Sequence, residues 1–217
     1  MTKSSPSLPE PDVLIYWLPG WFSAFHHGFG DALAAAHNVI PGVALRGHAS
    51  SRGVVQLTGS HPQDPLHIEK RHFEAPGGKE DIAALLEGFK VAQSHMGHPN
   101  ISSQVEAQIF PTQALNTDED IENHILETVF GASAAYPYVF LKINMAPTGC
   151  TASMGPDDGE FNPNAVLDGD FKIRGVKGLR VVDISSWAVV PGWFVATPTY
   201  MLSEKAADVI IAAAGAA

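Results

Sequence analysis

Residues 171–210 read FKIRGVKGLRVVDISSWAVVPGWFVATPTYMLSEKAADVI and carry the clearest structural signals in this sequence. The first part of this run predicts two short strands around Gly175 and Gly178. Thr197 and Pro198 then predict the start of a helix over residues 197–215, with Thr197 as its N-cap and Pro198 in the first helical position. We therefore expect a strand and a helix at the C-terminal end of the fold.

The upstream sequence contains apolar runs that alternate with turn signals and two amphipathic segments. We predict helices over residues 79–97 and 117–131, and Thr117 is the expected cap of the second helix. The predicted strands cover residues 12–20, 51–59, 65–73 and 136–143. The sequence therefore predicts an α+β fold, in which a mainly antiparallel sheet from segments in 12–73 and 105–143 carries both helices on one face.

Composition excludes several classes of protein. The chain has 217 residues, of which 45% are hydrophobic, so it can bury a sizeable core. A formal charge of −10 has the wrong sign for binding nucleic acid or an anionic membrane surface. No run approaches the roughly 18 apolar residues of a membrane span, and the N-terminal residues lack a secretory signal. We expect a cytoplasmic protein with no nucleic-acid or membrane partner.

The segment APTGCTASM, residues 146–154, has the composition of a loop that contacts a ligand through its backbone. Its Cys150 is the one cysteine of the chain, so no intrachain disulfide can form, and no Cys/His spacing matches a zinc site. Cys150 could act as a nucleophile or could be a packed small residue, and both interpretations stay open.

A second polar pattern is His67-x-Glu69-x-x-His72, which falls on a predicted strand. On a strand, His67 and Glu69 share one face while His72 points away, so the three side chains do not converge on a metal ion. We therefore predict no metal site and expect solvated or pocket-lining histidines.

Three C-terminal blocks resemble, in order and spacing, the signature of the glucose-methanol-choline (GMC) flavoprotein oxidoreductases. They are GCTASMGPDD, AVLDGDFKIRGVKGLRVVDISSW and PGWFVATPTYMLSEKAADVI. Upstream, SSRGVVQLTGSHPQDPLHIEKRHF resembles the substrate-domain hairpin of this family, and DIAALLEGFKVAQ resembles the helix that follows it. The resemblance implies a flexible lead over residues 1–11, a substrate-binding domain over 12–143 and a segment that returns to the FAD domain over 144–217.

The resemblance also implies functional residues. The helix start near Thr197 is similar to the family helix whose positive end faces the flavin, so FAD is the implied cofactor. The implied flavin contacts are Asp183, Ile184, Val195, Ala196 and Thr197. Thr148 and Trp193 are the implied substrate-pocket residues, and Trp187, Trp193 and Phe194 shape an apolar pocket unless some of them are plain core.

The sequence departs from the family in its catalytic residues. Family members take the proton of the substrate alcohol with a histidine assisted by a second histidine or an asparagine. The matching positions here are Pro147, or its neighbour Ala146, and Phe194, and all ten histidines lie at or before His124. General-base assistance is worth about 10²–10⁴-fold, so we expect poor alcohol oxidation from this chain.

A second departure is the missing dinucleotide-binding fingerprint. The nearest match to G-x-G-x-x-G is GFGDAL at residues 28–33, which lacks the third glycine. We therefore expect FAD-dependent oxidation of a small or aromatic alcohol only if a partner chain supplies the flavin half, and self-association is a second expectation. The alternatives are a vestigial or binding protein and a non-redox enzyme, such as a cyclase or dehydratase, that orients a substrate in the apolar pocket.

Overall fold

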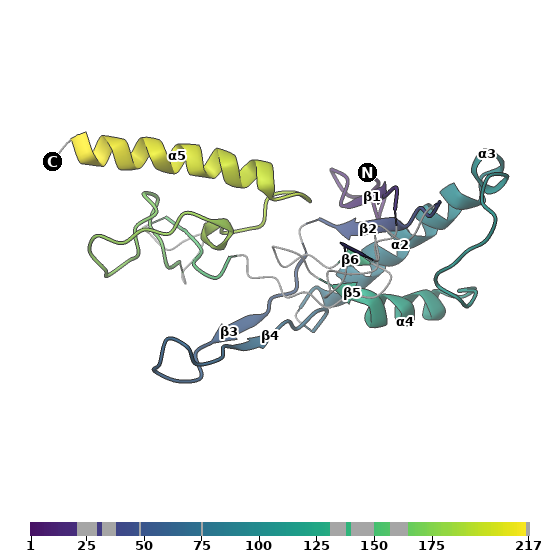
Figure 1. The fold of residues 1–217 in the computed structure, drawn as a ribbon, viewed down its shortest axis with the longest axis horizontal. Helices are drawn as coiled ribbons and strands as arrows, with labels where there is room; N and C mark the ends of the chain where they lie inside the picture. The colour runs from purple at the N-terminus through teal and green to yellow at the C-terminus, as the bar shows by residue number, and fades with distance from the viewer. Residues whose placement is uncertain are drawn as a thin grey trace. The chain divides into compact units, whose positions relative to one another are not determined.

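The computed structural model describes residues 1–20, 30–31, 38–47, 49–74, 76–130, 138–139, 150–156 and 165–215. These residues belong to two compact units, which can be followed along the chain in Figure 1. The first unit comprises the described residues within Met1–Gly53, Lys70–Ala132 and Tyr136–Ala146. The second comprises those within Val54–Glu69, Ser133–Ala135 and Pro147–Ala217. The predicted division into a lead (1–11), a substrate-binding domain (12–143) and a C-terminal segment (144–217) stays a prediction.

The first unit contains a four-stranded antiparallel sheet with the order β1-β2-β6-β5. Its strands are β1 (Val13–Trp17), β2 (Gly42–Arg46), β5 (Val129–Phe130) and β6 (Tyr138–Val139). Strand β2 was not predicted from the sequence. Gly42 lies opposite Trp17, and a Cβ atom at this position would lie 2.5 Å from the indole ring, so any larger residue would force the ring to move.

Helix α2 (Gly78–Gly97) packs on β1 and β2 and also contacts α4 (Asp118–Thr128). The short helix α3 (Pro99–Ser102) follows α2. Both long helices were predicted, although α4 ends three residues early because β5 takes over at Val129. The expected cap is confirmed: Thr117 and Asp120 form a reciprocal capping box.

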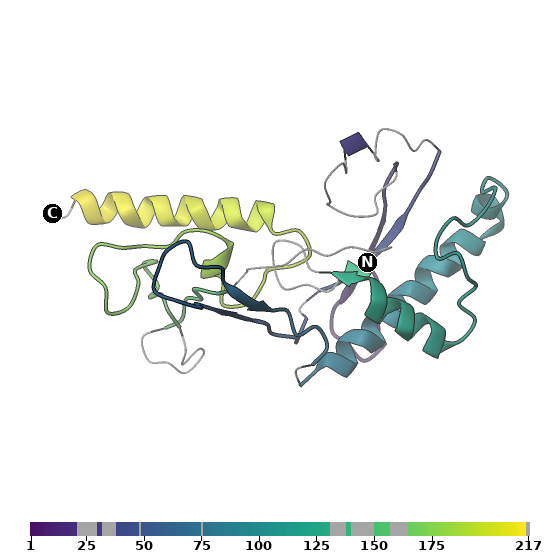
Figure 2. The same ribbon diagram turned by 60° about the horizontal axis from the view of Figure 1, so that its bottom comes forward.

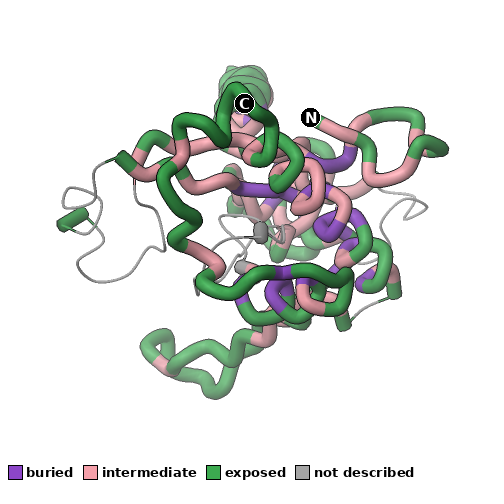
Figure 3. Tube along the Cα trace, turned by 90° about the vertical axis from the view of Figure 1, so that its right-hand side faces the viewer, coloured by how far each residue is buried: buried purple, intermediate pink, exposed green. Residues whose placement is uncertain are grey.

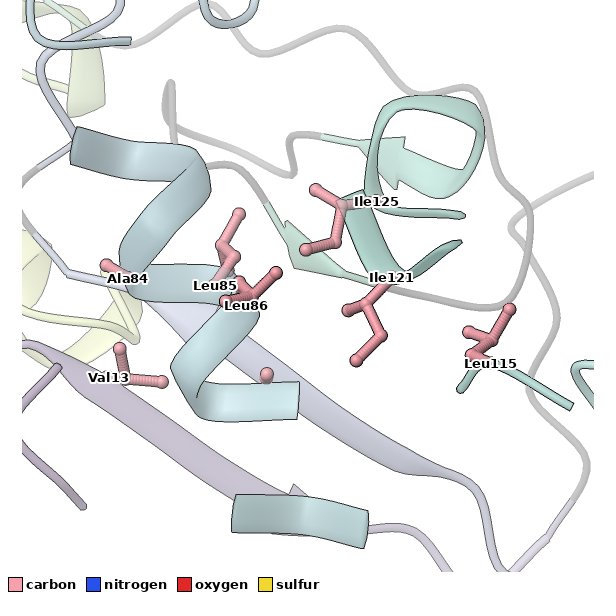
Figure 4. Packing of buried hydrophobic residues seen from close by; sticks show 8 residues of the cluster. Val13, Ala84, Leu85, Leu86, Leu115, Ile121 and Ile125 are labelled. Atoms are coloured by element: carbon pink, nitrogen blue, oxygen red, sulfur yellow. The ribbon is translucent and has the colours of Figure 1, made fainter. Parts of the chain in front are cut away.

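The core of the first unit lies between these helices and the sheet, as Figure 4 shows. Its buried members come from β1, β2, α2, α4 and the segment before α4. They are Val13, Ala44, Ala84, Leu85, Leu86, Leu115, Ile121 and Ile125. Ile121 and Ile125, four residues apart, lie on one face of α4, and they belong to the same cluster as Ala84, Leu85 and Leu86 of α2. This core supports the α+β interpretation.

The second unit begins with an antiparallel hairpin of β3 (Val54–Gln56) and β4 (His67–Glu69), in which Val55 lies opposite Ile68. Both strands were predicted, but as members of the larger sheet. Within the described residues they form a separate two-stranded sheet, so the expectation of a single sheet is wrong. Alternation of apolar residues predicts a strand but does not specify which strand it pairs with.

The predicted strands around Gly175 and Gly178 are reduced to two isolated antiparallel bridges, Lys172 with Arg180 and Ile173 with Leu167. The chain reverses direction between Lys172 and Arg180. Gly175 and Gly178, which lie in this turn, both have a φ of 77°, a conformation that favours glycine. The 3₁₀ helix η1 (Ile184–Ser186) and helix α5 (Ala196–Gly215) follow.

Helix α5 is confirmed as a helix, but its predicted start is wrong. The carbonyl oxygen of Val195 accepts the first helical hydrogen bond, from the Thr199 amide at 3.0 Å. Val195 is therefore the cap, and Pro198 is the third helical residue instead of the first. Leu202 and Ala206 anchor α5 on Phe171. The rest of the helix is largely exposed, as the colours of Figure 3 show. Figure 2 shows α5 as one continuous helix.

Candidate functional site

Residues 150–154 are tied to η1 by three backbone hydrogen bonds. The amides of Cys150, Ala152 and Met154 donate to the carbonyl oxygens of Ile184, Ser185 and Ser186, at 3.2, 3.0 and 3.0 Å. These carbonyls lack partners inside so short a helix, and the neighbouring extended segment satisfies all three. The end of the predicted active-site loop is therefore fixed to the turn that carries the predicted flavin contacts.

Asp183 caps η1 with its side chain. Its Oδ1 accepts hydrogen bonds from the Ser185 amide at 2.7 Å and from the Ser185 hydroxyl at 2.5 Å. The Ser186 hydroxyl donates to the Asp183 carbonyl at 2.6 Å. Oδ1 of Asp183 is therefore used inside the turn, and the rigid backbone of Asp183 and Ile184 can contact a ligand. Neither residue is buried.

The first turn of α5 presents free hydrogen-bond donors. Ala196 and Thr197 are exposed, and their amides donate to no described residue. Pro198 has no amide hydrogen, and the Thr199 amide and hydroxyl both bond to the Val195 carbonyl. A helix N-terminus carries a partial positive charge, so this turn can bind an electron-rich or anionic group.

Apolar side chains lie immediately before this turn in the sequence. Phe194 is 59% exposed and Val189 is 44% exposed, while Trp193 is half-buried. Trp187 packs on the Phe171 cluster, and its ring nitrogen is buried without a hydrogen-bond partner. Trp187 is therefore part of the core, whereas Trp193 and Phe194 are accessible to a substrate or another protein surface.

Cys150 is half-buried and has a φ of 64°. This left-handed conformation costs a residue other than glycine about 1–2 kcal/mol, and such strain is often found at functional loops. Pro147 and Thr148, together with Ala146 before them, lie outside the described residues. The structure thus describes one of the three residues expected in this loop, and the catalytic assignments at Pro147, Cys150 and Phe194 stay predictions.

The described histidines do not form a catalytic or metal-binding group. His67 lies 2.8 Å from Glu69, on the shared strand face that was expected. Burial lowers the pKa of His72, and the charge of Lys70 lowers it further. Within the part of the chain that the structure covers, no three metal-ligating side chains converge. His26, His27 and His48 lie outside that part.

Sequence reasoning missed the hydrogen-bonded turn around η1. Its signal was present: Asp183 precedes Ser185 by two residues, the spacing at which an aspartate side chain accepts from the backbone. Ser186, which is fully buried, also had no predicted role. No helix among the described residues is long and apolar enough to cross a membrane.

Comparison with known proteins identifies relatives over most of the chain. The family model described as GMC oxidoreductase matches residues 49–203. An alcohol dehydrogenase (acceptor) of Pseudomonas putida is 26% identical over 212 residues, which are 96% of this chain and 33% of the relative. A chloroplastic fatty acid photodecarboxylase of Chlamydomonas reinhardtii is also 26% identical, over 96% of this chain and 32% of its own length.

A solved structure is similar as well. The structure described as a new fungal aryl-alcohol oxidase aligns with a TM-score of 0.50 and 26% identity, over 73% of this chain and 23% of that one. The chain spans about a third of the length of the curated relatives it matches. The similarity to each of these proteins applies only to the part of that protein that aligns with this chain.

Proposed function

Because this chain belongs to the GMC oxidoreductase family, we propose that it forms the substrate-side part of an FAD-dependent enzyme that oxidises a small or aromatic alcohol. The observation that carries the proposal is the exposed first turn of α5, where the amides of Ala196 and Thr197 donate to no described residue. This turn lies within the residues that match the family model. When bound, FAD supplies a two-electron acceptor for the alcohol carbon.

The residues of this turn fit one edge of a flavin. The amides of Ala196 and Thr197 and the positive end of α5 suit an electron-rich ring edge that gains negative charge on reduction. The backbone of Asp183 and Ile184 is held rigidly by the η1 hydrogen bonds and can contact the same group. Residues 1–217 contain no dinucleotide-binding fingerprint, so we propose that polypeptide outside them binds the nucleotide half.

The apolar residues before α5 suit an aromatic or aliphatic substrate. Trp193 and Phe194 offer ring faces for stacking or apolar contact. The names of two relatives, an alcohol dehydrogenase and an aryl-alcohol oxidase, favour alcohol substrates. Phe194 cannot accept a proton, and no histidine follows His124 in the sequence, so proton removal is the weak step of the proposed reaction.

A second function, ligand binding or a non-redox reaction, is favoured by the absence of histidine at positions 147 and 194. A chain that keeps the fold but has Pro147 and Phe194 at the positions matching the bases of the family could bind a ligand or run a non-redox reaction against the apolar side chains before α5. One relative is named a fatty acid photodecarboxylase, so related proteins carry names outside alcohol oxidation. This alternative predicts ligand binding without any FAD requirement.

Flavin retention tests the proposal. The chain is co-expressed with the dinucleotide-binding part of a relative, and flavin absorbance is measured after gel filtration. Ala196→Pro removes one free amide at the first helical position, where proline is tolerated, whereas the matched control Ala196→Ser keeps it. We expect flavin in the unmodified complex and in the serine variant, and weaker retention in the proline variant. A colourless complex, or equal retention in both variants, would contradict the proposal.

A further inference from the structure

Strand β1 lies at the end of the sheet that the described strands of the first unit form, and β2 is its neighbour on one side. On the other side, Val13 exchanges two backbone hydrogen bonds with Thr2, at 2.8 and 3.1 Å. The Leu18 amide, in contrast, donates to the carbonyl of Pro41, directly before β2. Backbone groups of successive strand residues point alternately to the two sides, so the odd-numbered residues of β1 point away from β2.

Ile15 and Trp17 therefore direct their N–H and C=O groups to the outer edge of β1. No residue in the described part of the chain forms a hydrogen bond with these four groups. Leu14 and Tyr16, which alternate with them, direct their backbone groups toward β2. The outer edge of β1 is thus covered at Val13 and open at the next two outward-pointing residues.

Strand β1 lacks the features that usually protect the edge of a sheet. Natural edge strands carry charged side chains, prolines or bulges, which prevent another strand from pairing with them. The sequence VLIYW contains neither a charge nor a proline, and its register with β2 runs without a bulge. This edge is therefore suited to pairing with a further strand.

The bridge between Thr2 and Val13 sets the register of such a strand. The bridge is antiparallel, so residue numbers along the two partners change in opposite directions. The residue joined directly ahead of Met1 would then lie opposite Ile15, and the residue two positions earlier would lie opposite Trp17. A polypeptide that enters along this line satisfies all four open backbone groups of Ile15 and Trp17 with four hydrogen bonds.

We propose that the outer edge of β1 receives an antiparallel strand from the polypeptide that supplies the dinucleotide-binding part. The matched region is about a third of each relative, so most of the polypeptide of a relative lies outside it. A second copy of this chain fits less well. Pairing Ile15 with Trp17 of another copy would bring Pro19 of that copy beside Val13, where Thr2 already lies. The source of the strand rests on the proposed function, whereas the open edge does not.

Amide hydrogen exchange at single-residue resolution tests the proposal, with alternate residues of one strand as internal controls. In the chain alone, we expect the amides of Ile15 and Trp17 to exchange at least about tenfold faster than those of Leu14 and Tyr16, because only the latter are bonded to β2. In a fusion that joins the dinucleotide-binding part of a relative ahead of Met1, we expect all four amides to exchange slowly.

Two matched proline variants of the fusion test the register. Proline directly ahead of Met1 removes the N–H that would donate to the Ile15 carbonyl, whereas proline one position earlier replaces a residue whose N–H would point away from β1. We expect the first proline to speed the exchange of the Ile15 amide about tenfold and the second to leave it nearly unchanged.

Slow exchange of Ile15 and Trp17 in the chain alone, fast exchange of both in the fusion, or equal effects of the two prolines would overturn the proposal. Loss of protection at Leu14 and Tyr16 in the fusion would also overturn it, because the added polypeptide would then disrupt the sheet instead of extending it. Flavin absorbance of the same fusion separates this inference from the proposed function. Protected Ile15 and Trp17 amides in a colourless fusion would support the added strand and contradict flavin binding.

Discussion

Asp81 lies at the centre of the buried polar network that joins the N-terminal segment, β2 and α2. Its carboxylate, which is fully buried, accepts from Arg46 Nε at 3.1 Å and from the Ser50 and Ser51 amides at 2.8 and 3.2 Å. Arg46 also pairs with Asp12 at 2.5 Å. Arg46 thus pairs with two carboxylates, and the backbone amides of Ser50 and Ser51 donate to the second carboxylate oxygen of Asp81.

We predict that Asp81→Ala destabilises the first unit by about 3–5 kcal/mol, because it leaves the Nε–H of Arg46 and the Ser50 and Ser51 amides without their acceptor in the interior, while Asp12 still pairs with Arg46. Urea unfolding measures the change. Asp118→Ala is the matched control: it removes the exposed partner of Lys90, and exposed ion pairs contribute little. Equal losses in free energy of unfolding in the two variants would contradict the prediction, because the buried network would then contribute no more stability than an exposed ion pair.

The buried histidines predict a dependence of stability on pH. Burial lowers the pKa values of His72 and His124 below their ordinary value of 6.5. Below that value the unfolded chain binds more protons than the folded chain, so stability is full at higher pH and falls as the pH drops toward the folded pKa values. Unfolding curves across this range measure the effect.

The variant His124→Phe isolates the contribution of His124 to this pH dependence of stability. Phenylalanine keeps an aromatic ring between Phe89 and Phe110 but cannot be protonated. We expect the variant to lose less stability on acidification than the unmodified chain. An identical pH dependence in both proteins would assign the acid sensitivity to other groups.

Helix α5 depends on a single small cluster for its attachment. Leu202 and Ala206 are its only buried residues among those described, and both contact the cluster around Phe171. Leu202→Ala removes a buried side chain that is worth about 2–5 kcal/mol, so we predict faster hydrogen exchange along α5. Ile211→Ala is the control, because that side chain is 69% exposed. Unchanged exchange in Leu202→Ala would show that α5 is held by other contacts.

The elements that sequence reasoning predicted correctly are those with strong local signals. Thr117 and Asp120 defined the start of α4, and the apolar stripes of both long helices were unambiguous. Strand β2 was missed because its sequence, GVALR, is short and has no clear alternation. The hairpin β3–β4 was placed in the wrong sheet because strand pairing is decided by contacts distant in sequence.

The candidate site was predictable in part. The resemblance of residues 171–210 to family blocks pointed to Asp183, Ile184 and the start of α5. The Val195 cap was missed because threonine is the better capping residue, yet the Val195 carbonyl accepts the first helical bond.

The second unit exposes apolar surface that suggests association. Phe194, Met201 and Tyr200 are 59%, 69% and 75% exposed, and they fall within eight residues of sequence. We predict that the purified chain associates with itself or with a flavin-binding partner to cover these side chains. Sedimentation should show mass that rises with concentration, and Phe194→Ser with Met201→Ser should reduce it. A clean monomer at every concentration would contradict this prediction.

We propose that this GMC oxidoreductase chain binds one edge of a flavin but has Pro147 and Phe194 in place of the bases that the family uses for alcohol oxidation. The most direct measurement is the anaerobic rate at which an aryl alcohol bleaches the flavin, in a fusion of this chain to the flavin domain of a relative. We predict slow bleaching by the unmodified fusion and a rate higher by about 10²–10⁴-fold when Pro147→His and Phe194→His restore the two histidines. Equally fast bleaching by the unmodified fusion would contradict the account, because another residue would then supply the base.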